Sequence, residues 1–178
     1  PGHTQYTRNM VTAASNADVA ILLIDARKGV LTQTRRHAFI ASLMGIDQIV
    51  LAITKMDLIG YDQARYDEIV ADFVAIAETL EIPRLAVIPV SGVSGDNIAA
   101  RSAATPWYDG PTLIELLEEG MAASVFARAN VRVTAFSIIQ TCLSPARWFR
   151  EGGGVSQREV TDVLASMVMR GLSPQSAG

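Results

Sequence analysis

Residues 49–57 read IVLAITKMD, a short apolar run that ends directly in Thr54, Lys55, Met56 and Asp57. A run of this length and composition is typical of a strand buried in a parallel sheet. Ligands of nucleotide-binding α/β domains lie at the carboxyl ends of such strands. The polar residues that follow Ile53 are therefore candidates for a binding site.

The side chains of this strand end suit the recognition of guanine. The Asp57 carboxylate can accept two hydrogen bonds, from the ring N–H and from the exocyclic amine. We expect the Lys55 stem to lie along the base while its ammonium stays in solvent. Adenine would leave the carboxylate badly paired, which is costly for a buried charge. The alternative is that Asp57 is an ordinary turn or helix-cap acid.

The surrounding pattern predicts an incomplete doubly wound α/β domain over residues 1–119, with a mostly parallel sheet and flanking helices. Strands are expected at 19–24, 49–53 and 85–89, and helices at 32–44 and 62–80. Thr32 is expected to cap the first helix, whose inner face would carry Phe39, Ile40 and Leu43. The second helix has an apolar stripe of Ile69, Val70, Phe73, Ile76, Ala77 and Leu80. A short helix is expected to begin at Pro111 and Thr112.

Two further segments carry residues suited to a nucleotide. Pro1, Gly2 and His3 open the chain, where the glycine lets a backbone amide approach a phosphate and the histidine can place an attacking water. Ser91 and Gly92 follow the third strand and can present a hydroxyl and amides to the base edge. Each segment alone is more typical of a plain turn. Their order at successive strand ends favours a guanine-nucleotide site.

Other polar and aromatic residues have simpler interpretations. Asp25, at the end of the first strand, is interpreted as a turn or cap acid. A solvated helix face is favoured over a partner-binding patch for Arg27, Lys28, Arg35 and Arg36. Trp107 and Tyr108 are expected to close the 91–108 loop onto the core.

Composition excludes several classes of function. The net charge is -3 and no block of Lys or Arg occurs, which argues against nonspecific nucleic-acid binding. No apolar run approaches the roughly 20 residues of a membrane span. Cys142 is the only cysteine and the two histidines are far apart, so the sequence predicts no metal site and favours the cytoplasm.

Taken together, these motifs resemble the translation-factor class of GTPases. Residues 1–3 resemble the end of its Asp-x-Pro-Gly-His switch motif, residues 54–57 its Asn-Lys-x-Asp motif, and Ser91-Gly92 its Ser-Ala element. Within the class, residues 25–37, 60–63 and 106–117 look most like the GTPase subunit of sulfate adenylyltransferase. The resemblance implies GTP and Mg²⁺ as cofactors and a small catalytic subunit as partner. It also implies that GTP hydrolysis drives the formation of adenylyl sulfate from ATP and sulfate.

The chain departs from that pattern in three places. Thr54 stands where the family has asparagine, and Gly92 stands where it has alanine. No Gly-x-x-x-x-Gly-Lys-Ser/Thr loop occurs in the sequence, so the elements for the phosphates and Mg²⁺ are expected upstream of Pro1. For a chain without that loop we expect weak nucleotide binding and little turnover.

Residues 120–178 do not resemble the β-barrel domain that would follow in the family, and are interpreted as an irregular or helical tail. A reading frame moved by two bases would allow PDLSFAGTVVS at residues 140–150 and DGDA at 167–170, which resemble that barrel. A frame-shifted remnant is therefore one explanation. A genuine tail with a capped helix from Ser156 is the other.

Two further functions stay open at this stage. One is a translation elongation factor that binds aminoacyl-tRNA, which shares the same switch and base motifs. The other is an inactive GTPase fragment without a ligand. The segment from Arg27 to His37 argues against the elongation factor.

Overall fold

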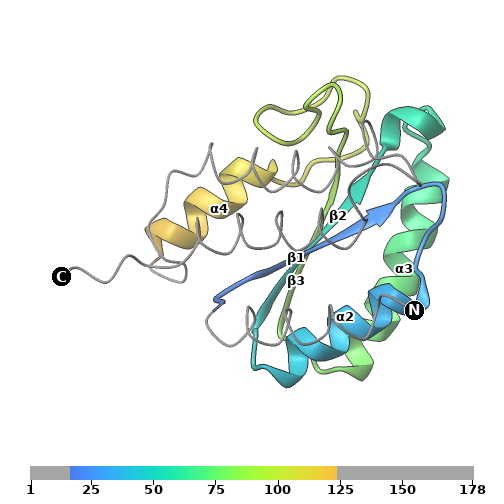
Figure 1. Ribbon diagram of the computed structural model, residues 1–178. Helices are drawn as coiled ribbons and strands as arrows, with labels where there is room; N and C mark the ends of the chain where they lie inside the picture. The colour runs from blue at the N-terminus through green and yellow to red at the C-terminus, as the bar shows by residue number, and fades with distance from the viewer. Residues whose placement is uncertain (1–16, 124–178) are drawn as a thin grey trace, which may run out of the picture.

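A computed structural model describes residues 17–123 of the 178-residue chain. Within this range strands and helices alternate along the chain (Figure 1). They are β1 (Ala20–Asp25), α2 (Thr32–Leu43), β2 (Gln48–Thr54), the 3-10 helix η1 (Met56–Ile59), α3 (Gln63–Thr79), β3 (Arg84–Pro89) and α4 (Leu113–Ala122). Each predicted strand and helix of this region is confirmed, with ends that differ by one residue or two.

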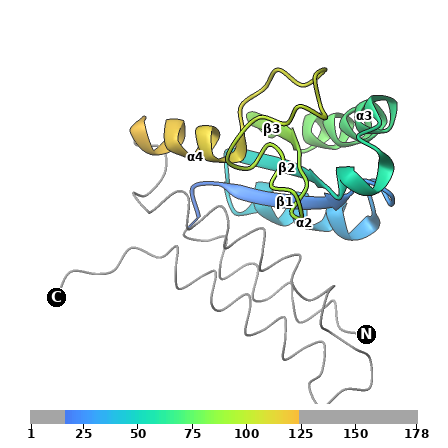
Figure 2. The ribbon, with the colours of Figure 1, turned by 90° about the horizontal axis from the view of Figure 1, so that it is seen from above.

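The strands form one parallel sheet in the order β1-β2-β3, as Figure 2 shows. Asp25 pairs with Thr54 at the end of β1, and Ile53 pairs with Pro89 at the end of β3. This register brings all three carboxyl ends to the same edge of the sheet. The predicted α/β class is thereby confirmed for the described residues.

Helices cover both faces of the sheet (Figure 1). On one face, alternate strand residues such as Ile24, Leu51 and Ile53 pack with α2 and α3. On the other face, Val50 and Ala52 pack with Ile88 and α4. Because β2 is buried on both sides, it reads as a continuous apolar run rather than an alternating one.

Helix α2 differs from its prediction in its cap and in its buried face. Its N-cap is Leu31, whose backbone N–H donates to the Thr34 hydroxyl at 3.4 Å, and Thr32 is the first helical residue. Ile40 is buried as expected, but Phe39 is 53% exposed and Leu43 is 65% exposed. The predicted cap at Thr32 and the predicted burial of Phe39 and Leu43 were therefore wrong.

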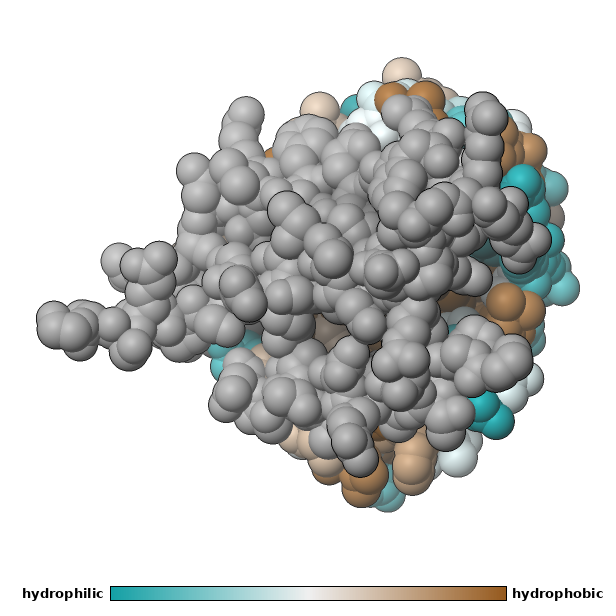
Figure 3. Space-filling view, viewed as in Figure 1, coloured by the Kyte–Doolittle hydropathy of each residue, from teal (hydrophilic) through white to brown (hydrophobic). Residues whose placement is uncertain are grey.

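The reason lies in the residues that do face the sheet. Ala38 and Ala41 are fully buried there, and their small side chains let the helix approach the strands closely. Phe39 and Leu43 therefore turn outward, whereas Ile40 stays buried. In the space-filling view, hydrophobic surface lies at the foot of the molecule, over the C-terminal ends of α2 and α3 (Figure 3).

The other two α-helices among residues 17–123 begin with side-chain caps. The Asp62 carboxylate accepts from the backbone N–H of Ala64 at 2.9 Å and starts α3. The Thr112 hydroxyl accepts from the N–H of Glu115 at 3.2 Å, and the Glu115 carboxylate accepts from the N–H of Thr112 at 2.7 Å. This reciprocal capping box satisfies amides that the first turn of α4 leaves free.

The loop after β3 returns to the core through two aromatic residues. Trp107 and Tyr108 pack against Tyr66 of α3, with ring centroids 4.9 and 6.4 Å away. The expectation that they close the loop onto the core is confirmed. No helix within residues 17–123 combines the length and apolar character needed to cross a bilayer. Residues 120–122, assigned to the tail from the sequence, form the end of α4. The predicted turn at Pro1 to His3 and residues 124–178 of the predicted tail lie outside the described residues.

Candidate functional site

Three strand ends meet at the carboxyl edge of the sheet. Asp25 ends β1, Thr54 ends β2 beside it, and Ser91 follows β3. Backbone bonds extend the ladders past the strands, from Ala26 N–H to Thr54 O at 2.9 Å and from Val90 N–H to Ile53 O at 2.8 Å. The edge is therefore held firmly where the sequence predicts a site.

Thr54 ties two of these strands together. Its side chain is 3% exposed and its hydroxyl donates to the Ile24 carbonyl oxygen at 3.0 Å. The hydroxyl of Thr54 thus bridges two neighbouring strands. The bond holds the end of β2 against the end of β1.

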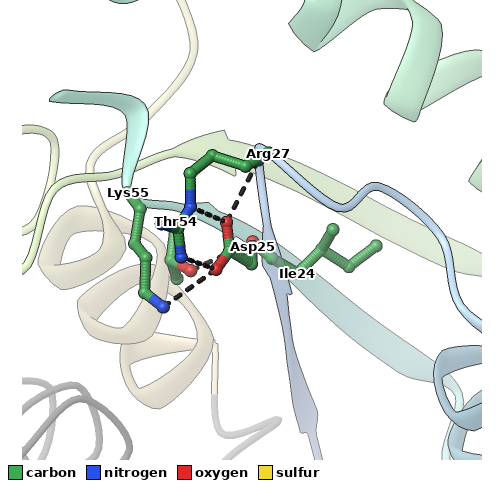
Figure 4. A network of polar contacts seen from close by, with 5 residues as sticks. All are labelled: Ile24, Asp25, Arg27, Thr54 and Lys55. Carbon is green, nitrogen blue, oxygen red and sulfur yellow. Dashed lines mark hydrogen bonds and ion pairs between the residues drawn. The ribbon is translucent and has the colours of Figure 1, made fainter. Parts of the chain in front are cut away.

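Lys55 leaves the strand in an unusual conformation. Its φ of 62° lies in the left-handed region, which costs a non-glycine residue about 1–2 kcal/mol. Its ammonium forms an ion pair with the Asp25 carboxylate, with Nζ 2.8 Å from Oδ2 (Figure 4). The ammonium was expected only in solvent; it is paired with a carboxylate at the end of the neighbouring strand, while the Lys55 side chain remains 28% exposed.

Asp25 accepts from a second cation as well. Arg27 donates from Nη2 to Oδ2 at 2.6 Å and from Nε to Oδ1 at 2.9 Å, so the guanidinium holds both oxygens (Figure 4). The Arg27 hydrogen bond, joined by that of Lys55, holds the pKa of Asp25 well below its usual range despite its partial burial. Asp25 is the centre of a charge cluster and more than a simple turn acid.

Asp57 carries an unsatisfied polar atom. Its Oδ1 is buried, and no hydrogen-bond partner for it exists among residues 17–123. Buried carboxylate oxygens are nearly always paired, so such an orphan calls for an explanation. Asp57 does lie in the first turn of η1, as the turn-acid alternative predicts, but this oxygen accepts from no amide in the described chain. A carboxylate left in this state is suited to accept hydrogen bonds from a ligand.

Ser91 is fully buried and closes its own turn. Its Oγ accepts from the backbone N–H groups of Val93 and Ser94, both at 3.3 Å. This contact is the strand-to-loop turn that the sequence left as the alternative for the side chain. The role of the Ser91 and Gly92 amides toward a base stays a prediction.

The predicted site residues fall into two groups. The structure brings Thr54, Lys55, Met56 and Asp57 to the same edge as Ser91 and Gly92. Pro1, Gly2 and His3 lie outside the described residues, and their predicted contacts with the γ-phosphate and water stay predictions.

Comparison with known proteins places this arrangement in a family. Residues 1–168 match the elongation factor Tu GTP binding domain. The chain belongs to this family. The fold of a structure titled Sup35 complexed with GMPPNP agrees with the assignment. It superposes with a TM-score of 0.51 at 33% sequence identity, over 57% of this chain and 28% of that one.

Curated relatives of this GTP-binding domain have more specific names. A bifunctional enzyme CysN/CysC of Xylella fastidiosa is 56% identical over 118 residues, which cover 66% of this chain and 19% of that protein. Sulfate adenylyltransferase subunit 1 of Rhizobium meliloti is 45% identical over 97% of this chain and 35% of its own length. The chain thus spans about a fifth to a third of the length of these relatives.

One polar link in this GTP-binding domain was not anticipated from the sequence. The Tyr61 hydroxyl, just past η1, donates to Asp96 Oδ2 at 2.5 Å, and Ser102 donates to Asp96 Oδ1 at 2.8 Å. Burial, and then the hydrogen bond with Asp96, raises the pKa of Tyr61. The link fastens the segment that carries Asp57 to the loop that carries Ser91. The signal in the sequence is that Tyr61 follows β2 and Asp96 follows β3, which places both side chains near the same edge of the sheet.

Proposed function

We propose that this chain binds guanine nucleotides at the carboxyl edge of its sheet. Asp57 reads the ring N–H and exocyclic amine of guanine, and the stem of Lys55 flanks the base. The observation that carries this proposal is the buried Oδ1 of Asp57, which has no partner among residues 17–123. A base donor at this oxygen would replace the missing hydrogen bond, so the site and guanine fit each other.

We further propose that the chain is the GTP-binding part of the GTPase subunit of a cytoplasmic sulfate adenylyltransferase. The identity of 56% to CysN/CysC supports this choice within the family, as does the match to a sulfate adenylyltransferase subunit 1 over 97% of the chain. In such an enzyme, GTP hydrolysis would drive the reaction of ATP and sulfate toward adenylyl sulfate. The small catalytic subunit would be the partner.

The roles of the remaining predicted residues follow the same proposal. Gly2 would approach the γ-phosphate through its amide, and His3 would position the attacking water. Met56 lies between Lys55 and Asp57 in the sequence and is fully buried, so it would hold the backbone of η1 in place. Mg²⁺ would accompany the phosphates, and we assign it no ligand among residues 17–123.

Guanine recognition can be tested by titrating the 178-residue chain, followed by NMR so that weak binding is measured. GDP, inosine diphosphate and ADP are compared at the same ionic strength. Inosine lacks the exocyclic amine that Asp57 would pair with. We expect GDP to bind about tenfold more tightly than inosine diphosphate and ADP more weakly still. Equal affinity for GDP and ADP would contradict the proposal.

An elongation-factor function is the competing candidate, and the similarity to Sup35 is the observation that favours it. Immobilised chain should be incubated separately with the small sulfate adenylyltransferase subunit and with aminoacyl-tRNA. Retention of the small subunit alone supports our proposal. Retention of tRNA alone would contradict the sulfate adenylyltransferase proposal and support the elongation-factor function.

A further inference from the structure

The contact between Lys55 and Asp25 has geometry that the base-reading motif alone does not explain. Nζ of Lys55 lies 2.8 Å from Oδ2 of Asp25, and the two side chains are 28% and 14% exposed. The two residues are 30 positions apart and belong to neighbouring strand ends. Figure 4 shows Lys55 and Arg27 converging on the same carboxylate. An ion pair this sheltered is screened less than one on the surface.

The backbone aims Lys55 at Asp25. Asp25 pairs directly with Thr54 in the parallel ladder, so Lys55 is the first residue beyond the paired strands. Its left-handed conformation, with φ of 62°, turns the chain into η1 at that point. The next polar side chain, Asp57, follows in the first turn of η1. Lys55 therefore stands between two carboxylates, one paired and one unpaired.

We propose that Asp25 is a positioning residue for nucleotide recognition, which holds the Lys55 ammonium at the end of β1 and away from Asp57. This inference rests on the guanine-binding function proposed above. Holding the ammonium fixes the four-carbon stem of Lys55 before a base arrives. It also leaves the Asp57 carboxylate free to accept from the base.

Two physical consequences make this arrangement useful. A free lysine side chain loses rotamer freedom when a base packs on it, and an anchored one has already lost it. A released ammonium also has an obvious new partner, because Asp57 offers a buried oxygen without a donor in the described chain. The Lys55 ammonium would then compete with guanine for the Asp57 carboxylate. Removing the charge of Asp25 should therefore weaken nucleotide binding through Lys55.

A purely structural role for Asp25 is the rival explanation. Its Oδ1 accepts from the backbone N–H of Arg27 at 3.1 Å, and its carbonyl oxygen accepts from the N–H groups of Lys28 and Gly29. These bonds close the turn after β1. Asparagine can accept the same backbone bond without the charge. Asp25→Asn therefore separates the turn from the ion pair.

A double-mutant cycle tests the inference on the 178-residue chain. Asp25→Asn is combined with Lys55→Met, which keeps an unbranched stem and removes the ammonium. GDP affinity is measured by NMR titration for all four proteins. We expect Asp25→Asn to weaken binding about three- to tenfold in the wild-type background and less than twofold in the Lys55→Met background. Equal losses in both backgrounds would overturn the inference.

Two controls accompany the cycle. Asp72→Asn makes the same change of charge at an exposed position of α3 and should leave GDP affinity within twofold of wild type. Asp25→Glu retains a carboxylate and should retain more affinity than Asp25→Asn. Loss of affinity on Asp72→Asn as large as on Asp25→Asn would show a general charge effect and overturn the inference.

A measurement made without nucleotide tests the positioning role of Asp25 separately from guanine-nucleotide binding. Relaxation of ¹³C at Cε of Lys55 reports whether the side chain is held. We expect Lys55 to become more mobile in Asp25→Asn, and unchanged mobility would overturn the positioning role alone. If GDP and ADP bind the wild-type chain equally while Lys55 still gains mobility, the proposed function fails. The role of Asp25 in recognition then fails with it.

Discussion

At the scale of single residues, the carboxyl edge of the sheet is organised by charge. Asp25 binds Arg27 and Lys55, whereas Asp57 keeps a buried oxygen without a partner in the described chain. The Asp57 charge also acts on Arg27, since it contributes to raising the pKa of that guanidinium after the larger effect of Asp25. The Asp25 carboxylate is thus occupied by two cations, whereas the Asp57 carboxylate keeps an oxygen that can accept from a ligand.

The pH dependence of stability should report the state of Asp25. Its folded pKa is lowered from 3.8, chiefly by Arg27, so its carboxylate stabilises the fold above about pH 4. Asp25→Asn should reduce the free energy of unfolding by on the order of 2 kcal/mol at pH 7. Below about pH 4 the unfolded chain takes up a proton at Asp25 while the native carboxylate stays ionised, so the difference should shrink as pH falls further toward the lowered folded pKa. Urea unfolding of both proteins between pH 3 and 7 measures it, and a difference independent of pH would contradict this account.

Thr54 gives a second prediction at this scale. Thr54→Val keeps the shape of the side chain and removes the hydroxyl that donates to Ile24 O. We expect a loss of about 1 kcal/mol in unfolding free energy, because a buried hydrogen bond between two strands is lost. Thr54→Ser retains the donor and should lose less. A greater loss for Thr54→Ser would show that methyl packing, and not the hydrogen bond, fixes this position.

The residue scale is also where the sequence was least informative. The position of Asp57 after an apolar run was enough to select it as a site residue. The pairing of Lys55 with Asp25 was not predicted, because it depends on strand register and on the left-handed backbone at Lys55. The contact joins residues 30 positions apart, so predicting it requires both the strand register and the backbone conformation at Lys55. The motif predicted the strand end and its chemistry, but the partner came from the neighbouring strand.

At the scale of elements, the fold follows from local signals of very different strength. Apolar runs predicted all three strands of the described region, and the Thr112 and Glu115 spacing marks the start of α4. Helix α2 was harder, because two of its three buried residues are Ala38 and Ala41, beside Ile40. Alanine contributes little to an apolar pattern, so the larger Phe39 and Leu43 dominated the prediction. The face of a helix that packs closely on a sheet is poorly marked by large residues.

The cap of α4 can be tested directly. Thr112→Ala removes the hydroxyl that accepts from the Glu115 N–H and should destabilise the protein by about 1 kcal/mol. Thr112→Ser keeps the acceptor and is the matched control. Thermal unfolding of the two variants separates the hydrogen bond from the loss of the methyl group. Equal melting temperatures for the two would exclude a capping role.

At the scale of the whole molecule, the parallel sheet of residues 17–123 separates two hydrophobic cores within that range. Phe73 of α3 is completely buried in the core beneath α2 and α3, whereas Phe39 of α2 is 53% exposed. Phe73→Ala should therefore cost about 3–5 kcal/mol of unfolding free energy. Phe39→Ala should change it by less than about 0.5 kcal/mol. Denaturant unfolding of the pair checks both values, and similar losses would mean that Phe39 is covered.

The same sheet that divides the cores also assembles the site. Its parallel strands deliver Asp25, the residues 54–57 and Ser91 to one edge, although these segments are far apart in the sequence. Membership of the elongation factor Tu GTP binding domain family agrees with that arrangement. In the proposed function, Asp57 selects guanine by accepting hydrogen bonds from both of its donors.

A change of base preference tests this role of Asp57 most directly. Asp57→Asn replaces one acceptor with an amide N–H₂, which matches xanthine, where a carbonyl stands in place of the exocyclic amine of guanine. Titrations of the wild-type and variant chains with GDP and xanthosine diphosphate, followed by NMR, provide the measurement. We predict that the wild type prefers GDP and that Asp57→Asn prefers xanthosine diphosphate, each by about tenfold. The same order of affinity in both proteins would contradict the assignment of Asp57 as the guanine reader.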